Sequence, residues 1–154
     1  MKTYELNVNG HLIKAQFDEQ NIQNIFIPLL KKWTQMQKEK NQRLLILLAA
    51  PPGTGKTTLS LFLEYLSQNI SNVTPLQALG MDGFHRYQDY LDTHYIIKDQ
   101  QKICMKDVKG CPETFDVDRL INKIKDMQTN DIDFPIYDRV LHNPVEDQIH
   151  ICQK

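Results

Sequence analysis

The sequence predicts an α/β fold in which helices flank a parallel sheet, and three observations support this class. Residues 44–49 form an apolar run of strand length that leads into a glycine-rich turn, and residues 58–66 then follow a helical pattern. Residues 73–81 resemble a second buried strand, which ends beside Asp82. Residues 4–17 alternate between apolar and polar side chains, as hairpin strands do. With 154 residues and no internal repeat, the chain is predicted to be a single domain over residues 1–154.

The first 40 residues are predicted to form a hairpin and a long helix that extend this domain. The two alternating segments are joined through Asn9-Gly10, a dipeptide that favours tight hairpin turns. Residues 18–40 place apolar side chains at three- and four-residue steps, with a kink expected at Pro28. That apolar face consists of Ile22, Ile25, Phe26, Leu29, Leu30 and Trp33. We assign both elements to packing rather than to a functional site.

The glycine-rich turn at residues 50–57 reads Ala-Pro-Pro-Gly-Thr-Gly-Lys-Thr. A strand, a glycine turn, Gly-Lys-Thr and a helix are the context of a phosphate-binding loop, in which Ala at the first position is a tolerated variation. Gly53 and Gly55 permit backbone conformations that bring amide groups close to a polyphosphate. The helix that begins near Lys56 adds its positive dipole end. Lys56 suits the outer phosphates and the Thr57 hydroxyl suits Mg²⁺, so the loop predicts a nucleoside triphosphate site.

Asp82 is the second candidate site residue. It stands at the end of the strand predicted at residues 73–81 and is followed by Gly and two aromatic residues. A strand that ends in an acid places a carboxylate at the carboxyl edge of a sheet, where ligands bind in open α/β folds. An isolated acid is as often an ordinary turn or helix cap. Its position one element after the phosphate loop favours the functional interpretation.

The rest of the chain carries weaker signals. Residues 86–97 are predicted to be helical and residues 98–109 to form an exposed, lysine-containing loop. Asp116 is expected to cap a helix that runs to about residue 128. Residues 134–144 gather aromatic, acidic, basic and imidazole groups beside two prolines, and residues 148–152 are expected to begin a short strand.

The composition limits the kinds of partner molecule and the cellular compartment expected for the protein. The net charge of −1 and the lack of a basic block argue against nucleic acid as the main partner. No apolar run approaches the roughly 20 residues needed to cross a bilayer, and no signal-peptide pattern opens the chain. Cys104, Cys111 and Cys152 lack the paired spacing of a zinc site and fit reduced thiols. We therefore expect a cytoplasmic protein without a membrane partner.

Four stretches together carry a family resemblance. They are residues 50–57, Met-Asp-Gly-Phe-His at 81–85, Lys-Gly-Cys-Pro-Glu-Thr-Phe-Asp at 109–116, and Pro-Ile-Tyr-Asp-Arg at 135–139 with His142. In this order and spacing the chain resembles the P-loop kinases of the phosphoribulokinase, uridine kinase and pantothenate kinase group, across about residues 40–145. It looks most similar to their bacterial nucleoside-, nucleotide- or sugar-kinase-like members. The first stretch is shared by many NTPases, whereas the other three are more specific.

The resemblance implies ATP-dependent phosphoryl transfer to a hydroxyl of a small metabolite, such as a nucleoside, a sugar or pantothenate. Asp82 matches the acid that accepts the hydroxyl proton, and Lys56 is the second catalytic candidate. ATP is expected on Pro52, Gly53, Thr54, Gly55, Lys56, Thr57 and Thr58, with Mg²⁺ at Thr57. The acceptor is expected to contact His85, Glu113, Tyr137, Arg139 and His142. Each of these five also has a plain structural alternative, such as a core aromatic for Tyr137 or a turn cap for Glu113.

Two departures from the family pattern affect the expected fold. Val108-Lys109 stands where many relatives have an Arg-Lys pair. The acid-ending strand and the arginine-bearing lid that follow in the family do not occur before Lys154. Each buried amide left unpaired by a missing strand costs about 1–3 kcal/mol, so the sheet edge needs a cover. The candidates are the hairpin, another chain as in a homodimer, or residues of a longer natural protein. We favour the last, and so expect an incomplete sheet, a truncated kinase domain and inefficient catalysis by these residues alone.

Two other functions remain open from the sequence. Pro-Pro-Gly-Thr-Gly-Lys-Thr-Thr-Leu also resembles the loop of ring-forming AAA-type ATPases, but the later strand ending in Asp-Glu that they require is not found. A non-catalytic ATP-binding kinase remnant is favoured by the early carboxyl terminus. The intact Lys56 and Asp82 argue against that remnant.

Overall fold

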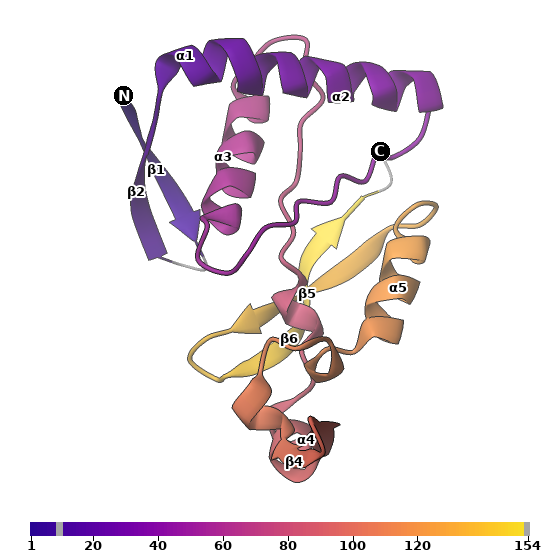
Figure 1. The fold of residues 1–154 in the computed structure, drawn as a ribbon. Helices are drawn as coiled ribbons and strands as arrows, with labels where there is room; N and C mark the ends of the chain where they lie inside the picture. The colour runs from indigo at the N-terminus through magenta and orange to yellow at the C-terminus, as the bar shows by residue number, and fades with distance from the viewer. Residues whose placement is uncertain (9–10, 153–154) are drawn as a thin grey trace. The chain divides into compact units, whose positions relative to one another are not determined.

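The computed structural model describes residues 1–8 and 11–152, which group into two compact units (Figure 1). Unit 1 is Met1–Leu79 and unit 2 is Gly80–Lys154. The single domain expected over residues 1–154 stays a prediction.

Unit 1 begins with the predicted hairpin. The strands β1 (Lys2–Val8) and β2 (His11–Phe17) pair antiparallel, with Lys2 opposite Phe17. The predicted Asn9-Gly10 turn lies outside the described residues. The alternating pattern therefore predicted the pairing of the two strands correctly. One face of the hairpin contributes Leu6 and Ala15 to the core.

The predicted long helix follows the hairpin, with one irregular turn. It consists of α1 (Glu19–Asn21), the π-helical η1 (Ile22–Phe26) and α2 (Ile27–Lys40). The Asp18 carboxylate caps its start by accepting from the amides of Gln20 and Asn21 at 2.8 and 3.2 Å. A proline ring clashes with the carbonyl four residues before it, and the wider π-helical turn contains the residue four positions before Pro28. The irregularity thus lies beside the residue where a kink was expected.

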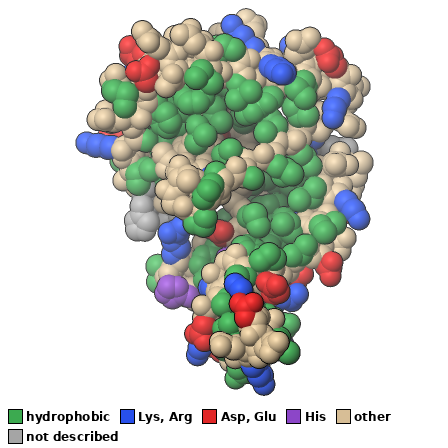
Figure 2. All heavy atoms as spheres, in the orientation of Figure 1, with side chains coloured by type: hydrophobic (Ala, Val, Ile, Leu, Met, Phe, Trp, Pro, Cys, Tyr) green, Lys and Arg blue, Asp and Glu red, His purple; other side chains and the backbone are tan. Residues whose placement is uncertain are grey.

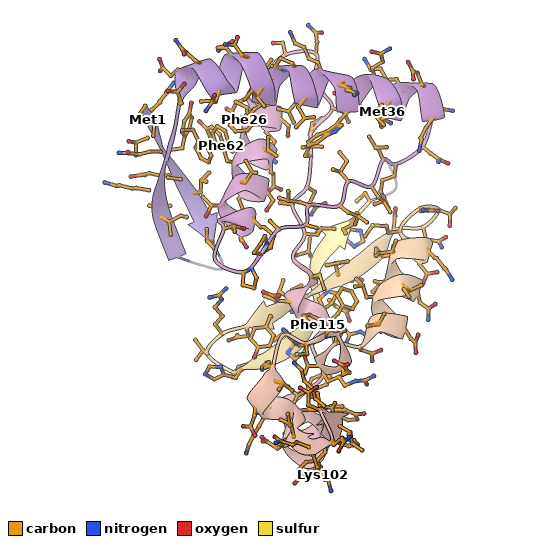
Figure 3. All side chains as sticks on the ribbon, in the orientation of Figure 1. Met1, Phe26, Met36, Phe62, Lys102 and Phe115 are labelled. Atoms are coloured by element: carbon orange, nitrogen blue, oxygen red, sulfur yellow. The ribbon has the colours of Figure 1, made fainter. Side chains whose placement is uncertain are left out.

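Helix α3 (Lys56–Gln68) supplies the centre of the core of unit 1. Phe62 is fully buried and its ring stacks on Phe17 with centroids 3.7 Å apart. Tyr4 and Phe26 meet the same ring edge-on at 4.9 and 5.7 Å. Figure 3 shows Phe26 and Phe62 close together. Such aromatic pairs add stability beyond the area they bury. The hairpin, the long helix and α3 therefore meet around Phe62.

The predicted strand at residues 73–81 is not formed, and its backbone contacts explain why. Three alternate amides of this extended segment are bonded by side chains of α2 and α3. The Thr74 amide donates to the Thr34 hydroxyl at 2.9 Å, and the Leu76 amide donates to the Ser67 hydroxyl at 2.8 Å. The Ala78 amide donates to the Glu64 carboxylate. Alternate amides of an extended chain point to one edge, so that edge is occupied. On the other edge Pro75 has no N–H to donate.

The predicted buried strand at residues 44–49 is also not formed. Ile46, Leu47 and Leu48 are 39%, 85% and 47% exposed, and hydrophobic side chains reach the surface on the face drawn in Figure 2. A strand requires a neighbouring strand, and each of the three sheets among residues 1–8 and 11–152 is an antiparallel pair of other segments. The mixed helix-and-strand class is observed, whereas the predicted parallel sheet is not confirmed.

Unit 2 is built around a short helix and a strand pair. They are the 3₁₀ helix η2 (Met81–Phe84), β5 (Ile132–Asp138) and β6 (Asn143–Ile151), and the two strands run antiparallel. The strand expected at residues 148–152 is the end of β6. Phe84 is fully buried and meets Phe134 edge-on at 5.0 Å. A Cβ on Gly83 would lie 2.5 Å from the Pro135 carbonyl oxygen, so only glycine allows η2 to approach β5 this closely.

Residues 86–109 differ from the prediction of a helix followed by a loop. The elements are α4 (Gln88–Thr93), β3 (Tyr95–Lys98), β4 (Gln101–Cys104) and the 3₁₀ helix η3 (Met105–Val108). β3 and β4 form a hairpin whose two turn residues, Asp99 and Gln100, have φ of 50° and 65°. Two positive φ values match the twist of a two-residue hairpin turn. The helical prediction was therefore wrong after Thr93.

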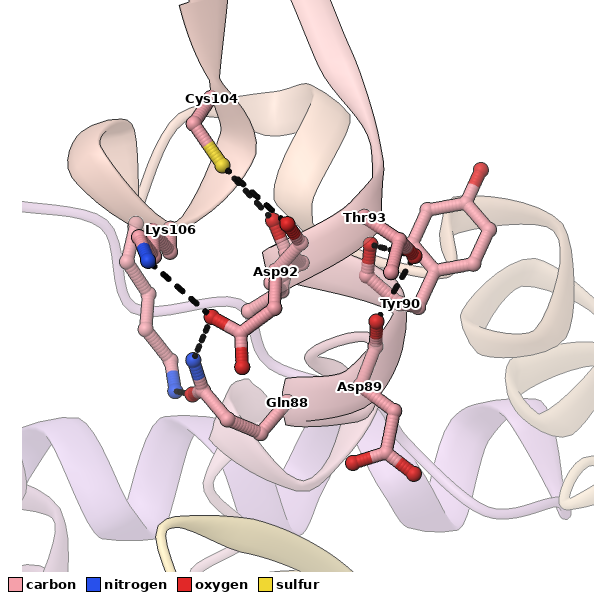
Figure 4. Close-up of polar contacts among 9 residues, drawn as sticks. Gln88, Asp89, Tyr90, Asp92, Thr93, Cys104 and Lys106 are labelled. Atoms are coloured by element: carbon pink, nitrogen blue, oxygen red, sulfur yellow. Dashed lines mark hydrogen bonds and ion pairs between the residues drawn. The ribbon is translucent and has the colours of Figure 1, made fainter.

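Polar contacts attach α4 to the segment that follows it (Figure 4). Asp92 forms an ion pair with Lys106 at 3.7 Å and accepts from the Gln88 side-chain amide at 3.1 Å. The Cys104 thiol donates to the Leu91 carbonyl at 3.3 Å, and Leu91 is itself fully buried. The short helix and the hairpin are thus held together by side chains as well as by the chain itself.

The last helix of unit 2 begins as predicted. After the 3₁₀ turn η4 (Pro112–Thr114), α5 (Val117–Asp126) starts at Asp116, whose carboxylate accepts from the Arg119 amide at 3.1 Å. Its predicted apolar face is only partly covered. Met127 is buried, whereas Val117 and Ile121 are 43% and 42% exposed.

Two observations bear on the expected cellular setting. No disulfide joins Cys104, Cys111 and Cys152 among residues 1–8 and 11–152. None of the helices in the described part of the chain combines the length and apolar character required to cross a bilayer. The cytoplasmic location stays a prediction.

Candidate functional site

The glycine-rich loop adopts a conformation that its sequence requires. Gly53 and Gly55 have φ of +77° and +84°, and a Cβ added at either would meet no atom within 4 Å. The glycines are therefore needed for backbone conformation and not for packing. Gly55 stands at the start of α3, where no side chain caps the first amides. Uncapped amides at a helix start, beside an exposed turn, are a ready site for a phosphate group.

The Lys56 side chain folds back over the loop. Its ammonium group donates to the carbonyl oxygens of Ala50 and Pro51 at 2.6 and 2.8 Å. The Thr54 hydroxyl also donates to the Pro51 carbonyl, at 2.8 Å. A long, flexible lysine can exchange such neutral acceptors for an anionic one by side-chain rotation. The positive charge is thus already held at the loop.

The predicted triphosphate contacts are consecutive and accessible. Residues 52–55 form the exposed turn, and Lys56 opens the helix. Thr57 is exposed and Thr58 half-buried in the first turn of α3. Positive-φ glycines with open Cβ positions, uncapped amides and one cation are the features a triphosphate requires, so these residues fit that group.

Asp82 and His85 lie together in unit 2. Asp82 is exposed in η2, whereas His85, which follows that helix, is only 8% exposed. The His85 Nδ1 lies 3.3 Å from the Thr114 carbonyl oxygen, and its ring stacks on Phe115 at 3.9 Å. Because a carbonyl oxygen only accepts, this bond needs a proton on Nδ1 and leaves Nε2 as an acceptor.

The environment of His85 favours its neutral form. Burial lowers the pKa of its imidazole, and the Lys109 charge lowers it further. The Thr114 hydrogen bond and the charge of Asp82 act in the opposite direction and are outweighed. His85 is therefore neutral near pH 7 and close enough to Asp82 to sense its charge.

Tyr137 joins this group through β5. Its ring meets His85 edge-on at 5.6 Å, and its hydroxyl accepts from the Lys109 ammonium at 2.6 Å. Lys109 also donates to the Gln88 side-chain oxygen at 3.3 Å. The structure thus brings together two of the five predicted acceptor residues, His85 and Tyr137, with the lysine of the 109–116 stretch.

The other three predicted acceptor residues, Glu113, Arg139 and His142, are exposed. Glu113 is in η4, and Arg139 and His142 are in the turn between β5 and β6. The Asp138 carboxylate holds that turn by accepting from the amides of residues 140 and 141 at 2.7 and 2.9 Å. In the described part of unit 2, none of the three forms a hydrogen bond or ion pair with His85 or Tyr137. Their roles stay predictions.

A pocket in unit 2 includes residues that the sequence interpretation missed. It has a volume of about 90 Å³ and is lined by His85, Arg86, Tyr87, Tyr90, Asp116 and Arg119. Arg86 directly follows the Met-Asp-Gly-Phe-His stretch, and Arg119 lies in the first turn after the Asp116 cap. Their positions beside these two motifs in the sequence could have identified Arg86 and Arg119 as candidate site residues.

Comparisons of sequence connect the chain with kinases. It is 42% identical over 148 residues to the uncharacterized protein YggC of Escherichia coli K12, covering 96% of this chain and 59% of YggC. It is 31% identical over 116 residues to a Schizosaccharomyces pombe protein whose name proposes a uridine kinase. This match covers 73% of this chain and 47% of that protein. It is 30% identical over 146 residues to a pantothenate kinase of Listeria monocytogenes. This match covers 86% of this chain and 44% of that protein. The chain therefore spans about half the length of the curated relatives it matches.

A solved structure shares the fold. A protein of Silicibacter sp. TM1040, described as a proposed fructose transport system kinase, aligns with a TM-score of 0.58 and 24% identity. The alignment covers 80% of this chain and 57% of that protein. No protein-family model matches the chain. The chain thus has the fold of a kinase-named structure and is similar in sequence to uridine and pantothenate kinases, which supports a P-loop kinase-like family.

Proposed function

We propose that this chain is the ATP-binding part of a kinase that transfers a phosphoryl group to a hydroxyl of a small metabolite. One observation carries the proposal: an exposed loop with two positive-φ glycines leads into an uncapped helix and holds a lysine ammonium. Sequence similarity to proteins named as uridine and pantothenate kinases supports the reaction class.

In this proposal the loop holds the triphosphate. The amides around Gly53 and Gly55 and those at the start of α3 donate to phosphate oxygens, and Lys56 turns from the loop carbonyls toward the outer phosphates. Mg²⁺ at the Thr57 hydroxyl would supply neutralising charge on those oxygens. No atom lies within 4 Å of the Cβ positions of Gly53 and Gly55, so no neighbouring side chain crowds the loop there.

Asp82 is proposed as the base. Its exposed carboxylate takes the proton of the acceptor hydroxyl while the hydroxyl oxygen bonds to the γ-phosphorus. The bond from that phosphorus to the bridging oxygen breaks, and ADP leaves. The neutral His85 offers Nε2 to a second polar hydrogen of the acceptor, which would orient the molecule beside Asp82.

The acceptor is proposed to be a small polar molecule. Uridine, pantothenate and fructose appear in the names of the relatives, and each carries hydroxyl groups. Tyr137 and Lys109 provide polar groups beside His85 for such a molecule. We propose Glu113, Arg139 and His142 as further acceptor contacts.

A radiolabel assay tests the function. The complete natural gene product is incubated with Mg²⁺ and γ-labelled ATP, and with uridine, pantothenate or fructose in separate reactions. We expect label in a phosphorylated form of at least one acceptor. Label that appears only as inorganic phosphate, or ATP binding without any transfer, would replace the proposal with an ATPase or a non-catalytic ATP-binding module.

A further inference from the structure

The Lys109 ammonium is held by neutral oxygens from two elements of unit 2. It donates to the Tyr137 hydroxyl oxygen of β5 at 2.6 Å and to the Gln88 side-chain oxygen of α4 at 3.3 Å. It also lies 4.8 Å from the centre of the Tyr137 ring. Among the described residues no carboxylate pairs with Lys109. This lysine therefore orients two neighbouring side chains rather than balancing a negative charge.

The turn that carries Lys109 is itself fixed by hydrogen bonds. The Cys111 amide donates to the Val108 carbonyl at 3.0 Å, and the Gly110 amide donates to the Thr114 hydroxyl at 3.0 Å. Thr114 is fully buried. The Lys109 side chain thus starts from a backbone of defined direction, so less conformational freedom is lost when its ammonium is placed on the phenol oxygen.

The chemistry of these groups determines which of them donates. A lysine ammonium has three N–H donors and no acceptor. The Tyr137 oxygen must therefore accept from Lys109, and its own O–H hydrogen points elsewhere. The Gln88 oxygen accepts in the same way, while its amide nitrogen donates to the Asp92 carboxylate at 3.1 Å (Figure 4). Both ends of the Gln88 amide are thus used, which keeps its oxygen directed at Lys109.

Tyr137 and His85 together leave one donor and one acceptor unused. Among the residues that the structure describes, the Tyr137 hydroxyl has no hydrogen-bond partner besides Lys109, so its hydrogen remains a donor. The His85 ring meets Tyr137 edge-on at 5.6 Å. Its Nδ1 is used by the Thr114 carbonyl, which leaves Nε2 as an acceptor. Two neighbouring side chains therefore offer opposite hydrogen-bonding groups to a ligand.

We propose that Lys109 is a positioning residue of the acceptor site, which occupies a lone pair of the Tyr137 oxygen and so directs the Tyr137 hydroxyl hydrogen to an oxygen of the acceptor. This inference rests on the proposed function and adds to it a residue that acts through Tyr137 without touching the acceptor. In the absence of Lys109 the hydroxyl rotates freely and donates to water for part of the time. The acceptor then loses a hydrogen bond.

NMR of the 154-residue chain tests the contact without catalysis. Lys109→Met should move the Tyr137 ring Cζ signal, because the phenol oxygen loses a charged donor. It should also raise the pKa of His85, since the Lys109 charge lowers it. Lys109→Arg keeps the charge and should restore both signals toward those of the wild type, and the exposed Lys125→Met should change neither. An unchanged Tyr137 signal in Lys109→Met would overturn the proposal.

A double-mutant cycle tests whether Lys109 acts through Tyr137. The complete gene product is assayed for kcat/KM with the acceptor that the radiolabel assay identifies. Lys109→Met and Tyr137→Phe should each lower kcat/KM about three- to tenfold, the worth of one neutral hydrogen bond. The double variant should lose no more than either single variant, because both changes remove the same hydrogen bond. Lys125→Met is again the control.

The outcomes of the cycle separate this role from the kinase function. Losses that multiply in the double variant would show independent roles for Lys109 and Tyr137 and would overturn the proposal, as would an unchanged kcat/KM in Lys109→Met. A wild type that transfers label to no acceptor would overturn the kinase function itself, a result distinct from both.

Discussion

Lys56 determines, at the scale of one residue, whether the loop binds a triphosphate. Lys56→Ala removes the cation that now rests on two loop carbonyls, and the uncapped amides alone are expected to hold Mg-ATP weakly. At ligand concentrations near 100 times Kd, binding stabilises a native state by about 2.7 kcal/mol. We expect the wild type to gain melting temperature with Mg-ATP and Lys56→Ala to gain none. The exposed Lys31→Ala is the control, and a retained shift in Lys56→Ala would refute the loop assignment.

His150 makes stability depend on pH. It faces Asp133 across β5 and β6 with Nδ1 2.7 Å from the carboxylate, and this bond raises the pKa of His150 above its ordinary value of 6.5. The protonated form is favoured in the folded state, so the stabilisation is complete below pH 6.5. It disappears as pH rises through the folded pKa. The pKa of His85 shifts in the opposite direction, because burial lowers it.

The variant His150→Gln isolates this effect. It should lose more stability relative to wild type at pH 5.5 than at pH 8.5, as measured by urea unfolding. Asp133→Asn should give the same pattern, since it removes the other partner of the pair. Equal losses at both pH values would show that the pair contributes no pH-dependent stability.

At the scale of elements, side chains of α2 and α3 take the place of a neighbouring strand. Ser67 is 2% exposed, and its hydroxyl accepts from the Leu76 amide while donating to the Glu64 carbonyl. Ser67→Ala leaves that amide unsatisfied, which costs about 1–3 kcal/mol. We expect lower stability in urea and faster hydrogen exchange at Leu76. The exposed Ser71→Ala should change neither quantity, and unchanged exchange in Ser67→Ala would contradict this role.

Elements encoded by local signals were predictable from the sequence. The hairpin, the long helix and the Asp116 cap follow from alternation, from apolar spacing and from a single capping side chain. The strands expected at 44–49 and 73–81 depend on partners, and hydropathy does not show whether a partner is present. The hairpin of β3 and β4 was missed because its turn, Asp99-Gln100, contains no glycine.

The candidate site, like the fold, was predictable where a local motif encodes it and not where packing does. Residues 50–57 form a contiguous motif, so their spacing alone indicated the loop. The grouping of His85 with Tyr137 came from the family resemblance. The pocket of Arg86 and Arg119 depends on how η2, α4 and α5 pack together in unit 2, and no local pattern records that packing.

At the scale of the whole molecule, the proposed reaction draws on both units. The triphosphate loop belongs to unit 1, and Asp82 belongs to unit 2. Neither unit alone is therefore expected to transfer phosphate. We propose that the Asp82 carboxylate acts on the acceptor of a nucleotide bound at residues 50–57.

Phosphoryl transfer by Asp82→Asn tests this claim most directly. The complete gene product and its variant are compared for Mg-ATP binding and for transfer of label to the acceptor, with the exposed Asp118→Asn as control. We predict unchanged ATP binding in both variants and a loss of about 10²–10⁴-fold in transfer for Asp82→Asn alone. Transfer by Asp82→Asn at the wild-type rate would contradict the account.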